Sequence, residues 1–381
     1  MIRPTVVLAG GGTGGHVFPA VAVAEAMHAL ADVDVVFCGT PRGLEARVVP
    51  RRGWRIEMLD VEPIQGGGLG RVVRGGVLAA SATAKALGLV RALRPRVVLS
   101  VGGYAAGPAS LAAVLLGVPI AVLEANQVVG LANRILAPFA ARAYVVWDEA
   151  AARFRPSARR VVGLPLRPGF GPRAYIPSAV VARVLVMGGS QGAACLNERL
   201  PEALARLRDI PGLQVLHQAG RDQDVAVREA YRRERVDRVE VVPFIDDVAR
   251  ALQDADLVVA RAGAATLAEI TAVGRAAVLV PFPHAADDHQ ARNAEALARA
   301  GAAVCLRQDV ADPGRLAADM GRLLRDATVR TAMADSSRGL GRPRAAHDVA
   351  ADLLDLAGIP HASCSGTNSG IRWSAPASEA S

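Results

Sequence analysis

A strand, a glycine-rich turn and a helix follow one another twice in this chain, once in each half. The first copy runs from Val6 to Gly15 (VVLAGGGTGG) and the second from Val184 to Ala193 (VLVMGGSQGA). Short apolar runs alternate with amphipathic segments after each copy, which is typical of a doubly wound α/β fold. Two such units of similar size predict two Rossmann-like domains that face each other across a cleft.

The apolar runs predict one parallel sheet in each half. The expected strands are Thr5–Ala9, Asp34–Phe37, Val97–Ser100, Ile120–Leu123 and Ala143–Val146, then Val184–Met187, Gln214–Gln218, Val239–Val242, Leu257–Ala260 and Ala277–Pro281. Proline and glycine interrupt Gly163–Pro177, which marks the joint. We expect domains over residues 1–163 and 164–343, a helix at about 344–358 that packs back on the first domain, and a disordered tail over 361–381.

The composition limits the classes of partner that the chain is expected to bind. The 381 residues and 51% apolar content suit two globular domains. A net charge of +8, nearly all arginine, favours phosphates, nucleic acid or an anionic membrane surface. Aromatic residues make up only 4% of the chain, which disfavours a base-stacking nucleic-acid surface. The four cysteines form no CxxC pair and no signal peptide is visible, so we expect a reducing cytoplasmic environment.

One uncharged stretch, Val97–Leu123, is long enough to span a bilayer. Gly102-Gly103, Gly107-Pro108 and Gly117-Val118-Pro119 divide it into pieces of strand and helix length. A strand, glycine turn, helix and second strand in a buried parallel sheet would have this composition. We therefore predict a soluble α/β segment rather than a transmembrane helix.

The first glycine turn, Gly10–Gly15, fits GxGxxG and precedes a helix predicted over Val17–Leu30. Its glycines allow a ligand to approach the backbone, and a helix N-terminus offers N–H groups to an anion. The acid that would hold a dinucleotide ribose is missing, because the second strand ends in Phe37-Cys38-Gly39-Thr40. His16 follows the turn, where it either faces the ligand or only hydrogen-bonds the loop. The second turn, Gly102-Gly103-Tyr104, is either another ligand loop or a tight turn.

In the second half, Arg261–Thr266 opens a helix of small residues that contains Glu269. Such a helix start can seat a diphosphate, and Glu269 could accept hydrogen bonds from a ribose or stabilise the helix dipole. The cluster Pro281–Gln290 follows the next strand at the ligand-binding edge of the sheet. A metal site from His284, Asp287 and His289 is disfavoured because no i,i+4 pair is present.

The segment Arg71–Arg96 mixes apolar and basic residues, among them Lys85, the only lysine. This mixture suits either docking on an anionic membrane surface or an ordinary helix with a basic solvent face.

Together these motifs resemble the MurG family of peptidoglycan N-acetylglucosaminyltransferases. The matching segments are Gly11–Ala20, Gly102–Pro108, Gly188–Ala193, Phe244–Asp247, Arg261–Glu269 and Pro281–Gln290. The resemblance implies a GT-B architecture and an inverting transfer of GlcNAc from UDP-GlcNAc to lipid I, the undecaprenyl-linked acceptor, which gives lipid II. It also implies a peripheral protein on the cytoplasmic face of the bacterial inner membrane, with no cofactor and no protein-bound metal.

The resemblance also assigns roles to individual residues. It gives the diphosphate to Ser190 and its loop, the uracil to Ile245, the ribose to Glu269 and the sugar to His289 and Gln290. The further donor positions are Thr13, Gly14, Gly15, Asn126, Arg167, Ala264, Ala265, Thr266 and Leu267. The acceptor loops are Gly11, Gly12, Gly102, Gly103 and Tyr104. His16 is the expected general base, with an ordinary imidazole pKa suited to neutral pH.

Two segments depart from the family pattern. Leu123-Glu124-Ala125-Asn126 stands where the family usually has His-Glu-Gln-Asn, and Gly163-Leu164-Pro165-Leu166-Arg167 replaces Gly-Asn-Pro-x-Arg. Two other functions share the expected architecture: a UDP-GlcNAc 2-epimerase-like enzyme, which needs no acceptor, and a non-catalytic nucleotide-sugar-binding protein.

Overall fold

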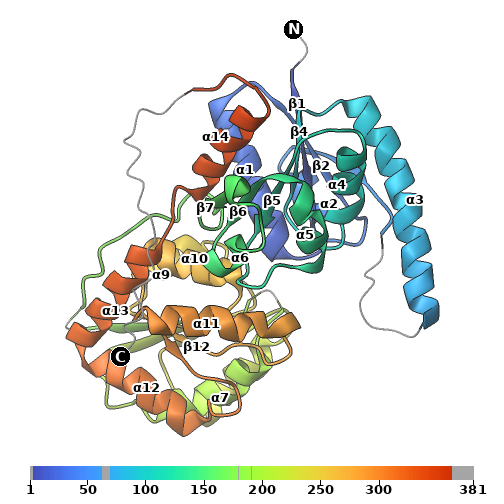
Figure 1. The fold of residues 1–381 in the computed structure, drawn as a ribbon. Helices are drawn as coiled ribbons and strands as arrows, with labels where there is room; N and C mark the ends of the chain where they lie inside the picture. The colour runs from blue at the N-terminus through green and yellow to red at the C-terminus, as the bar shows by residue number, and fades with distance from the viewer. Residues whose placement is uncertain (1–2, 62–68, 179, 190, 363–381) are drawn as a thin grey trace, which may run out of the picture.

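The computed structural model describes residues 3–61, 69–178, 180–189 and 191–362, with side chains omitted for residues 69–80. Figure 1 shows two α/β domains, the first built mainly from the blue-to-green half of the chain and the second from the yellow-to-orange half. Each domain holds one parallel sheet with helices on both faces. The predicted fold class is therefore confirmed.

The first sheet has seven strands in the order β3-β2-β1-β4-β5-β6-β7. They are β1 (Thr5–Ala9), β2 (Asp34–Gly39), β3 (Arg55–Met58), β4 (Val97–Ser100), β5 (Ile120–Glu124), β6 (Ala140–Val145) and β7 (Arg159–Val161). The accompanying helices are α1 (Gly14–Leu30), α2 (Glu45–Arg51), α3 (Leu69–Leu93), α4 (Ala106–Leu115), α5 (Leu131–Leu136) and α6 (Asp148–Ala151). β4 and β5 are buried throughout because helices cover both faces, which explains their continuous apolar sequence.

The second sheet has six strands in the order β10-β9-β8-β11-β12-β13. They are β8 (Ala182–Met187), β9 (Leu213–Gln218), β10 (Val239–Val242), β11 (Leu257–Ala260), β12 (Ala277–Leu279) and β13 (Val304–Cys305). Its helices are α7 (Ala194–Ala205), α8 (Asp224–Arg233), α9 (Val248–Asp254), α10 (Ala264–Val273), α11 (His289–Arg299), α12 (Pro313–Arg325) and α13 (Ala327–Leu340). In both sheets the chain order reverses beside the first strand, and ligands of open α/β sheets bind at that point.

The last helix, α14 (Ala345–Leu356), returns to the first domain and lies beside α1 (Figure 1). Its apolar face joins the core beneath α1 through Val349, Ala350, Leu353 and Leu354. Asp352 accepts hydrogen bonds from Arg142 Nε at 3.0 Å and from the Tyr144 hydroxyl at 2.8 Å. Within the described residues the chain therefore crosses between the domains twice, once before β8 and once before α14.

The uncharged stretch forms β4, the ten-residue α4 and β5, as predicted. Within the described residues, no helix combines the length and apolarity that a membrane span requires. Three edge strands, β3, β7 and β13, were not predicted, because they are short and two of them carry arginine. Of the tail expected to be disordered, residues 363–381 lie outside the described residues.

Candidate active site

The glycine turn after β1 leads directly into α1. Gly10, Gly11 and Gly12 have φ of +146°, +159° and +92°, and Thr13 is extended before the helix. α1 begins at Gly14, so the prediction of a start at Val17 was wrong. Gly14, Gly15 and His16 form its first turn, and Thr13 makes no side-chain cap. The first-turn N–H groups are thus not capped by a side chain, as an anion site requires.

A buried carboxylate that the sequence analysis missed holds this turn. Glu45, at the start of α2, accepts hydrogen bonds from the Gly12 N–H at 2.7 Å and the Thr40 N–H at 2.9 Å. Its carboxylate lies so close to Gly11 and Gly43 that a Cβ on either would collide with it. Glu45 therefore fixes the loop conformation, and only glycine fits around it.

The turn after β4 packs against the first turn and against His16. Gly102 and Gly103 have φ of +88° and +76°, and a Cβ on Gly103 would lie 2.5 Å from the Gly11 carbonyl oxygen. A Cβ on Gly102 would lie 3.2 Å from His16 Nε2, and Tyr104 lies beside Gly12. The two acceptor loops predicted from the sequence thus meet around the His16 ring.

The His16 imidazole is half-buried, and its Nδ1 lies 3.3 Å from the Thr13 hydroxyl. Burial lowers the pKa of His16, although Glu124 and, more weakly, Glu45 act in the opposite direction. The expectation of an ordinary imidazole pKa was therefore wrong. A lowered pKa keeps the ring neutral at pH 7, in the form that can accept a proton.

A hydrogen-bonded group organises the end of β5. Glu124 accepts hydrogen bonds from the Asn126 N–H at 3.1 Å and from the Gly130 N–H and Asn133 Nδ2, both at 3.0 Å. Ser100 at the end of β4 donates to Asn133 Oδ1 at 3.0 Å. Leu123, one of the departures from the family pattern, is buried in the core of the first domain. The remaining polar groups, Glu124 and Asn126, are held by neighbours that the sequence did not single out.

In the second domain, α10 begins at Ala264 without a side-chain cap, and Figure 1 shows it on the side turned toward the first domain. Ala265 and Thr266 are half-buried in its first turn, whereas Leu267 is buried. Glu269 makes no hydrogen bond with any described residue. Burial raises the pKa of Glu269 to about 7, and the nearby Arg167 opposes this shift.

Gln290 and His289 open α11 at the ligand edge of the sheet. Gln290 Oε1 accepts hydrogen bonds from the Ala262 N–H at 3.2 Å and the Phe282 N–H at 3.0 Å, so it ties together the loops after β11 and β12. His289 Nδ1 lies 2.7 Å from the Ala286 carbonyl oxygen. Asp287 and Asp288 just before it have φ of +52° and +53°, a conformation that is strained for non-glycine residues.

Several contacts join the two domains. The Arg167 guanidinium lies over the Phe18 ring of α1 at 4.8 Å. Asn293 on α11 accepts from the Gln127 N–H at 3.3 Å and donates to Asn126 Oδ1 at 3.5 Å. A cavity of about 570 Å³ is lined by residues of both domains, and its wall includes Ala264, Leu267 and the second departure, Leu164.

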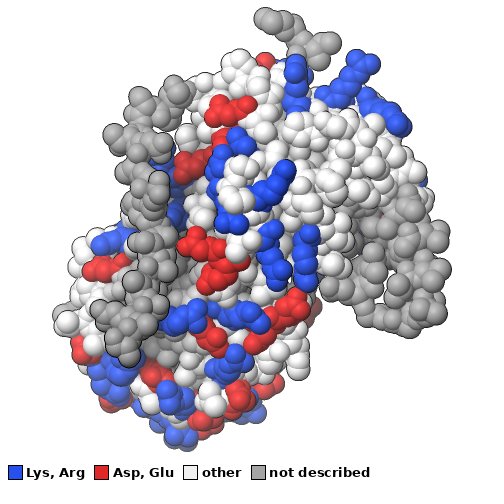
Figure 2. All heavy atoms as spheres, viewed as in Figure 1, with Lys and Arg blue, Asp and Glu red and all other residues white. Residues whose placement is uncertain are grey.

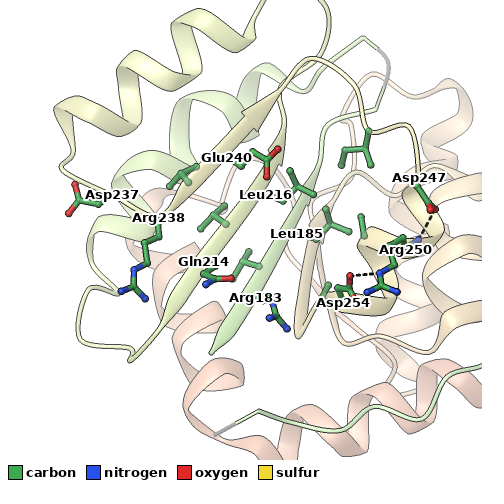
Figure 3. A pocket seen from close by; sticks show the side chains of 16 residues that line it. Arg183, Leu185, Gln214, Leu216, Asp237, Arg238, Glu240, Asp247, Arg250 and Asp254 are labelled. Atoms are coloured by element: carbon green, nitrogen blue, oxygen red, sulfur yellow. Dashed lines mark hydrogen bonds and ion pairs between the residues drawn. The ribbon is translucent and has the colours of Figure 1, made fainter. Parts of the chain in front are cut away.

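The uracil position, Ile245, is 7% exposed and follows β10. It lines a hollow of about 710 Å³ on one face of the second sheet. Figure 3 shows this hollow beside the strands, with Arg183 and Arg238 near one end. Along α9, Asp247 accepts from the Arg250 backbone N–H and Asp254 accepts from Arg250 Nε. Its mixed charges do not match a purely anionic ligand. Ser190, predicted to hold the diphosphate, lies outside the described residues.

The structure brings the predicted residues together as two groups, one on each domain. His16, Gly102, Gly103 and Tyr104 gather on the first domain, while Glu269, His289 and Gln290 lie on the second. Asn126 and Arg167 connect them. Among the described residues no group of three or more His, Cys, Asp or Glu side chains could hold a metal ion.

Comparison with known proteins identifies the family. Residues 6–145 match the glycosyltransferase family 28 N-terminal domain, and residues 183–349 match its C-terminal domain. The UDP-N-acetylglucosamine--N-acetylmuramyl-(pentapeptide) pyrophosphoryl-undecaprenol N-acetylglucosamine transferase of Sorangium cellulosum is 52% identical over 93% of this chain and 89% of that protein. The protein of the same name from Acidithiobacillus ferrooxidans is 43% identical over 93% of this chain and 98% of that protein.

Solved structures agree. Acinetobacter baumannii MurG superposes with a TM-score of 0.78 at 34% identity, covering 93% of this chain and 99% of that chain. The UDP-GlcNAc 2-epimerase of Neisseria meningitidis has a TM-score of 0.66 but only 12% identity over 93% of this chain and all of that one, so it shares the fold alone. The chain belongs to glycosyltransferase family 28 and, within it, to the MurG family of peptidoglycan N-acetylglucosaminyltransferases.

Proposed function

We propose that this protein transfers GlcNAc from UDP-GlcNAc to lipid I and so makes lipid II. The observation that carries the proposal is the 52% identity, along almost the whole chain, to a relative named for this transfer. The opposed groups around His16 and Glu269 fit such a two-substrate reaction, because each domain supplies one set of ligand-binding groups. The epimerase-like alternative has only the fold in its favour.

The chemistry assigned to the site is a direct displacement. The acceptor hydroxyl attacks the anomeric carbon of GlcNAc and a C–O bond forms. The bond from that carbon to the diphosphate breaks, and UDP leaves with the electron pair. His16 takes the hydroxyl proton, which a neutral imidazole can do. The configuration at the anomeric carbon inverts.

We assign the donor mainly to the second domain, with Thr13, Gly14, Gly15 and Asn126 of the first domain facing it across the cleft. Glu269 would accept hydrogen bonds from the ribose hydroxyls, Ile245 would meet the uracil, and His289 and Gln290 would meet the sugar. The uncapped start of α10 supplies N–H groups that can stabilise the leaving diphosphate. In this proposal no cation or cofactor is required. Arg167 lies at the boundary between the domains, where its charge can assist UDP departure.

The protein is also proposed to work at the anionic cytoplasmic surface of the inner membrane, without spanning it. Apolar side chains project from α4, α5 and the turn after them: Leu111, Leu115, Leu131, Ile135 and Phe139 are 39–62% exposed. Two basic groups accompany them, both at least half exposed: Arg134 lies on α5 and pairs with Asp287, and Lys85 lies on α3, which packs on α4, and pairs with Asp60. In Figure 2 the visible face of the second domain mixes acidic and basic side chains; on the first domain an uncharged area over α4 and α5 has basic side chains around it, while acidic side chains lie toward α14. Such a surface suits a membrane better than nucleic acid.

The decisive experiment measures transfer of labelled GlcNAc from UDP-GlcNAc to a solubilised lipid I analogue, with chelator added to half the samples. Equal product in both sets supports the transferase and a metal-independent reaction. Product only without chelator overturns the metal-free assignment. UDP-GlcNAc binding without product overturns the transferase, and turnover of UDP-GlcNAc without acceptor to an epimer points to the epimerase.

A further inference from the structure

Asn293 is fully buried on α11, yet the hydrogen bonds of its side chain go to the other domain. Its Oδ1 accepts from the Gln127 N–H and its Nδ2 donates to Asn126 Oδ1. A buried amide normally finds partners, because leaving it unpaired costs free energy. Here those partners are available only while the two domains are in contact.

On the first domain, Asn126 connects Asn293 through Glu124 to His16, the proposed base. Asn126 donates its N–H to Glu124 at 3.1 Å, and Glu124 is the carboxylate with the largest charge effect on the pKa of His16. In the segment 123–126, Leu123 is buried in the core and Ala125 is apolar, so Glu124 and Asn126 are its polar side chains. Among the described residues, Asn293 is the second-domain side chain that hydrogen-bonds Asn126 in this segment.

On the second domain, Asn293 lies on the same helix as His289 and Gln290, the proposed sugar-binding residues. It lies three residues after Gln290 and four after His289, which places the three on neighbouring positions of one helix face. Gln290 in turn is fixed by the loops after β11 and β12. A rigid helix thus connects the donor side of the cleft to the Glu124–Asn126 segment.

We propose that Asn293 is a positioning residue that couples closure of the donor domain to the alignment of Asn126 and Glu124 beside His16. Its bonds of 3.3 and 3.5 Å are long, so they can break and reform as the domains separate and close. The proposal rests on the transferase function above, and it adds a specific side chain through which the two halves of the site act together.

The test compares Asn293→Ala with Arg292→Ala, a control at an exposed neighbouring position of α11. We expect Asn293→Ala to lower kcat about tenfold, since two neutral hydrogen bonds are lost, while UDP affinity stays unchanged. Acceptor-independent hydrolysis of UDP-GlcNAc should rise relative to transfer, because imperfect closure admits water. Arg292→Ala should match the wild type in all three measurements.

A double-mutant cycle separates positioning from simple interface packing. If Asn293 acts through Asn126, Asn293→Ala lowers kcat less when Asn126→Ala is already present, because only the bond to the Gln127 N–H then remains to be lost. Additive effects, or equal losses of kcat and UDP affinity, would overturn the proposal. Denaturation of each variant shows whether lost folding explains a result.

The wild-type protein distinguishes this idea from the proposed function. If it does not transfer GlcNAc, coupling can still be followed by the fluorescence of Trp147, whose indole N–H donates to the Ala125 carbonyl oxygen at 3.2 Å. A fluorescence change on adding UDP-GlcNAc that disappears in Asn293→Ala supports the coupling. The same change in both proteins would contradict it.

Discussion

Protonation at single residues governs the proposed reaction. His16 and Glu269 are both pushed by burial toward their neutral forms, one as a base and one as an acid. For His16 the neutral form is the active one. For Glu269 the neutral form accepts fewer hydrogen bonds than the carboxylate. A bound ribose should therefore shift the protonation equilibrium of Glu269 toward the carboxylate.

His16→Ala should lower turnover about 10²-fold or more and leave UDP-GlcNAc affinity near normal. Because burial lowers the pKa of His16, kcat/KM of the wild type should decrease on the acid side only at pH values below the ordinary imidazole pKa. Steady-state kinetics across pH, with binding measured by calorimetry, checks both points. Equal losses of turnover and affinity would remove His16 from its role as base.

For Glu269, we expect UDP-GlcNAc affinity to rise as pH increases through about 7, the pKa of its carboxyl. The ionised carboxylate accepts hydrogen bonds from the ribose hydroxyls, so binding must release a proton near that pH. Calorimetry in two buffers of different ionisation enthalpy measures the released proton. Glu269→Gln should abolish the release, and its persistence in that variant would assign it to another group.

At the scale of elements, the glycine turns after β1 and β4 set the shape of the first-domain site. The two turns follow adjacent parallel strands, so they lie side by side at the edge of the sheet where the carboxyl ends of β1 and β4 meet. The left-handed φ values of Gly102 and Gly103 let the second turn approach the Gly11 carbonyl and the His16 ring.

Gly103→Ala should destabilise the first domain by about 1–3 kcal/mol, because the residue has φ of +76° and its Cβ would lie 2.5 Å from the Gly11 oxygen. Gly107→Ala is the matched control: it lies in α4, and a Cβ there meets nothing within 4 Å. The control should be neutral or slightly stabilising, by up to about 1 kcal/mol. Urea denaturation compares them, and similar behaviour of the two variants would contradict this view of the turn.

Sequence patterns predicted the central strands well, because buried parallel strands are continuous apolar runs bounded by glycine. They missed β3 and β7, whose Arg55 and Arg159 look like loop residues at an exposed edge. They also placed the start of α1 three residues late, since Gly14 and Gly15 have poor intrinsic helix propensity but accept the helical conformation after Thr13.

The site residues were predicted mainly from the resemblance to a family. The residues that hold them in place, such as Glu45 and Asn293, were not predicted. Glu45 has no local motif, and its role depends on folding back onto Gly12 from 33 positions away. Asn293 and Asn126 are 167 positions apart in sequence, so only the packing of the domains brings them together. The spacing of Asn293 after Gln290 was the one signal that could have drawn attention to it.

At the scale of the whole molecule, the two domains are joined by paired crossings of the chain. Gly163 in the first crossing packs on Arg342 in the second, and a Cβ on Gly163 would lie 2.4 Å from the Arg342 Cβ. A rotation of the domains about these crossings would change the contact between Gly163 and Arg342.

Gly163→Ala should therefore slow transfer, because a residue with a Cβ is strained at φ of +84° and would push against Arg342, which changes the geometry of the hinge. UDP affinity should stay normal, because the proposed UDP-binding groups lie mainly on the second domain. Gly171→Ala, in the same linker with nothing within 4 Å of its Cβ, should behave as wild type. Transfer kinetics and UDP calorimetry on both variants provide the check. Normal kinetics in Gly163→Ala would show that the hinge tolerates the added methyl group.

The return of α14 has a consequence for how this protein is made on the ribosome. The core beneath α1 is completed by Val349, Leu353 and Leu354, which are synthesised after the entire second domain. The domain that emerges first therefore waits for the end of the chain with part of its apolar surface uncovered, while the second domain can fold before it. A chain that stops short of α14 would leave its earliest-made half unfinished and open to chaperones and proteases.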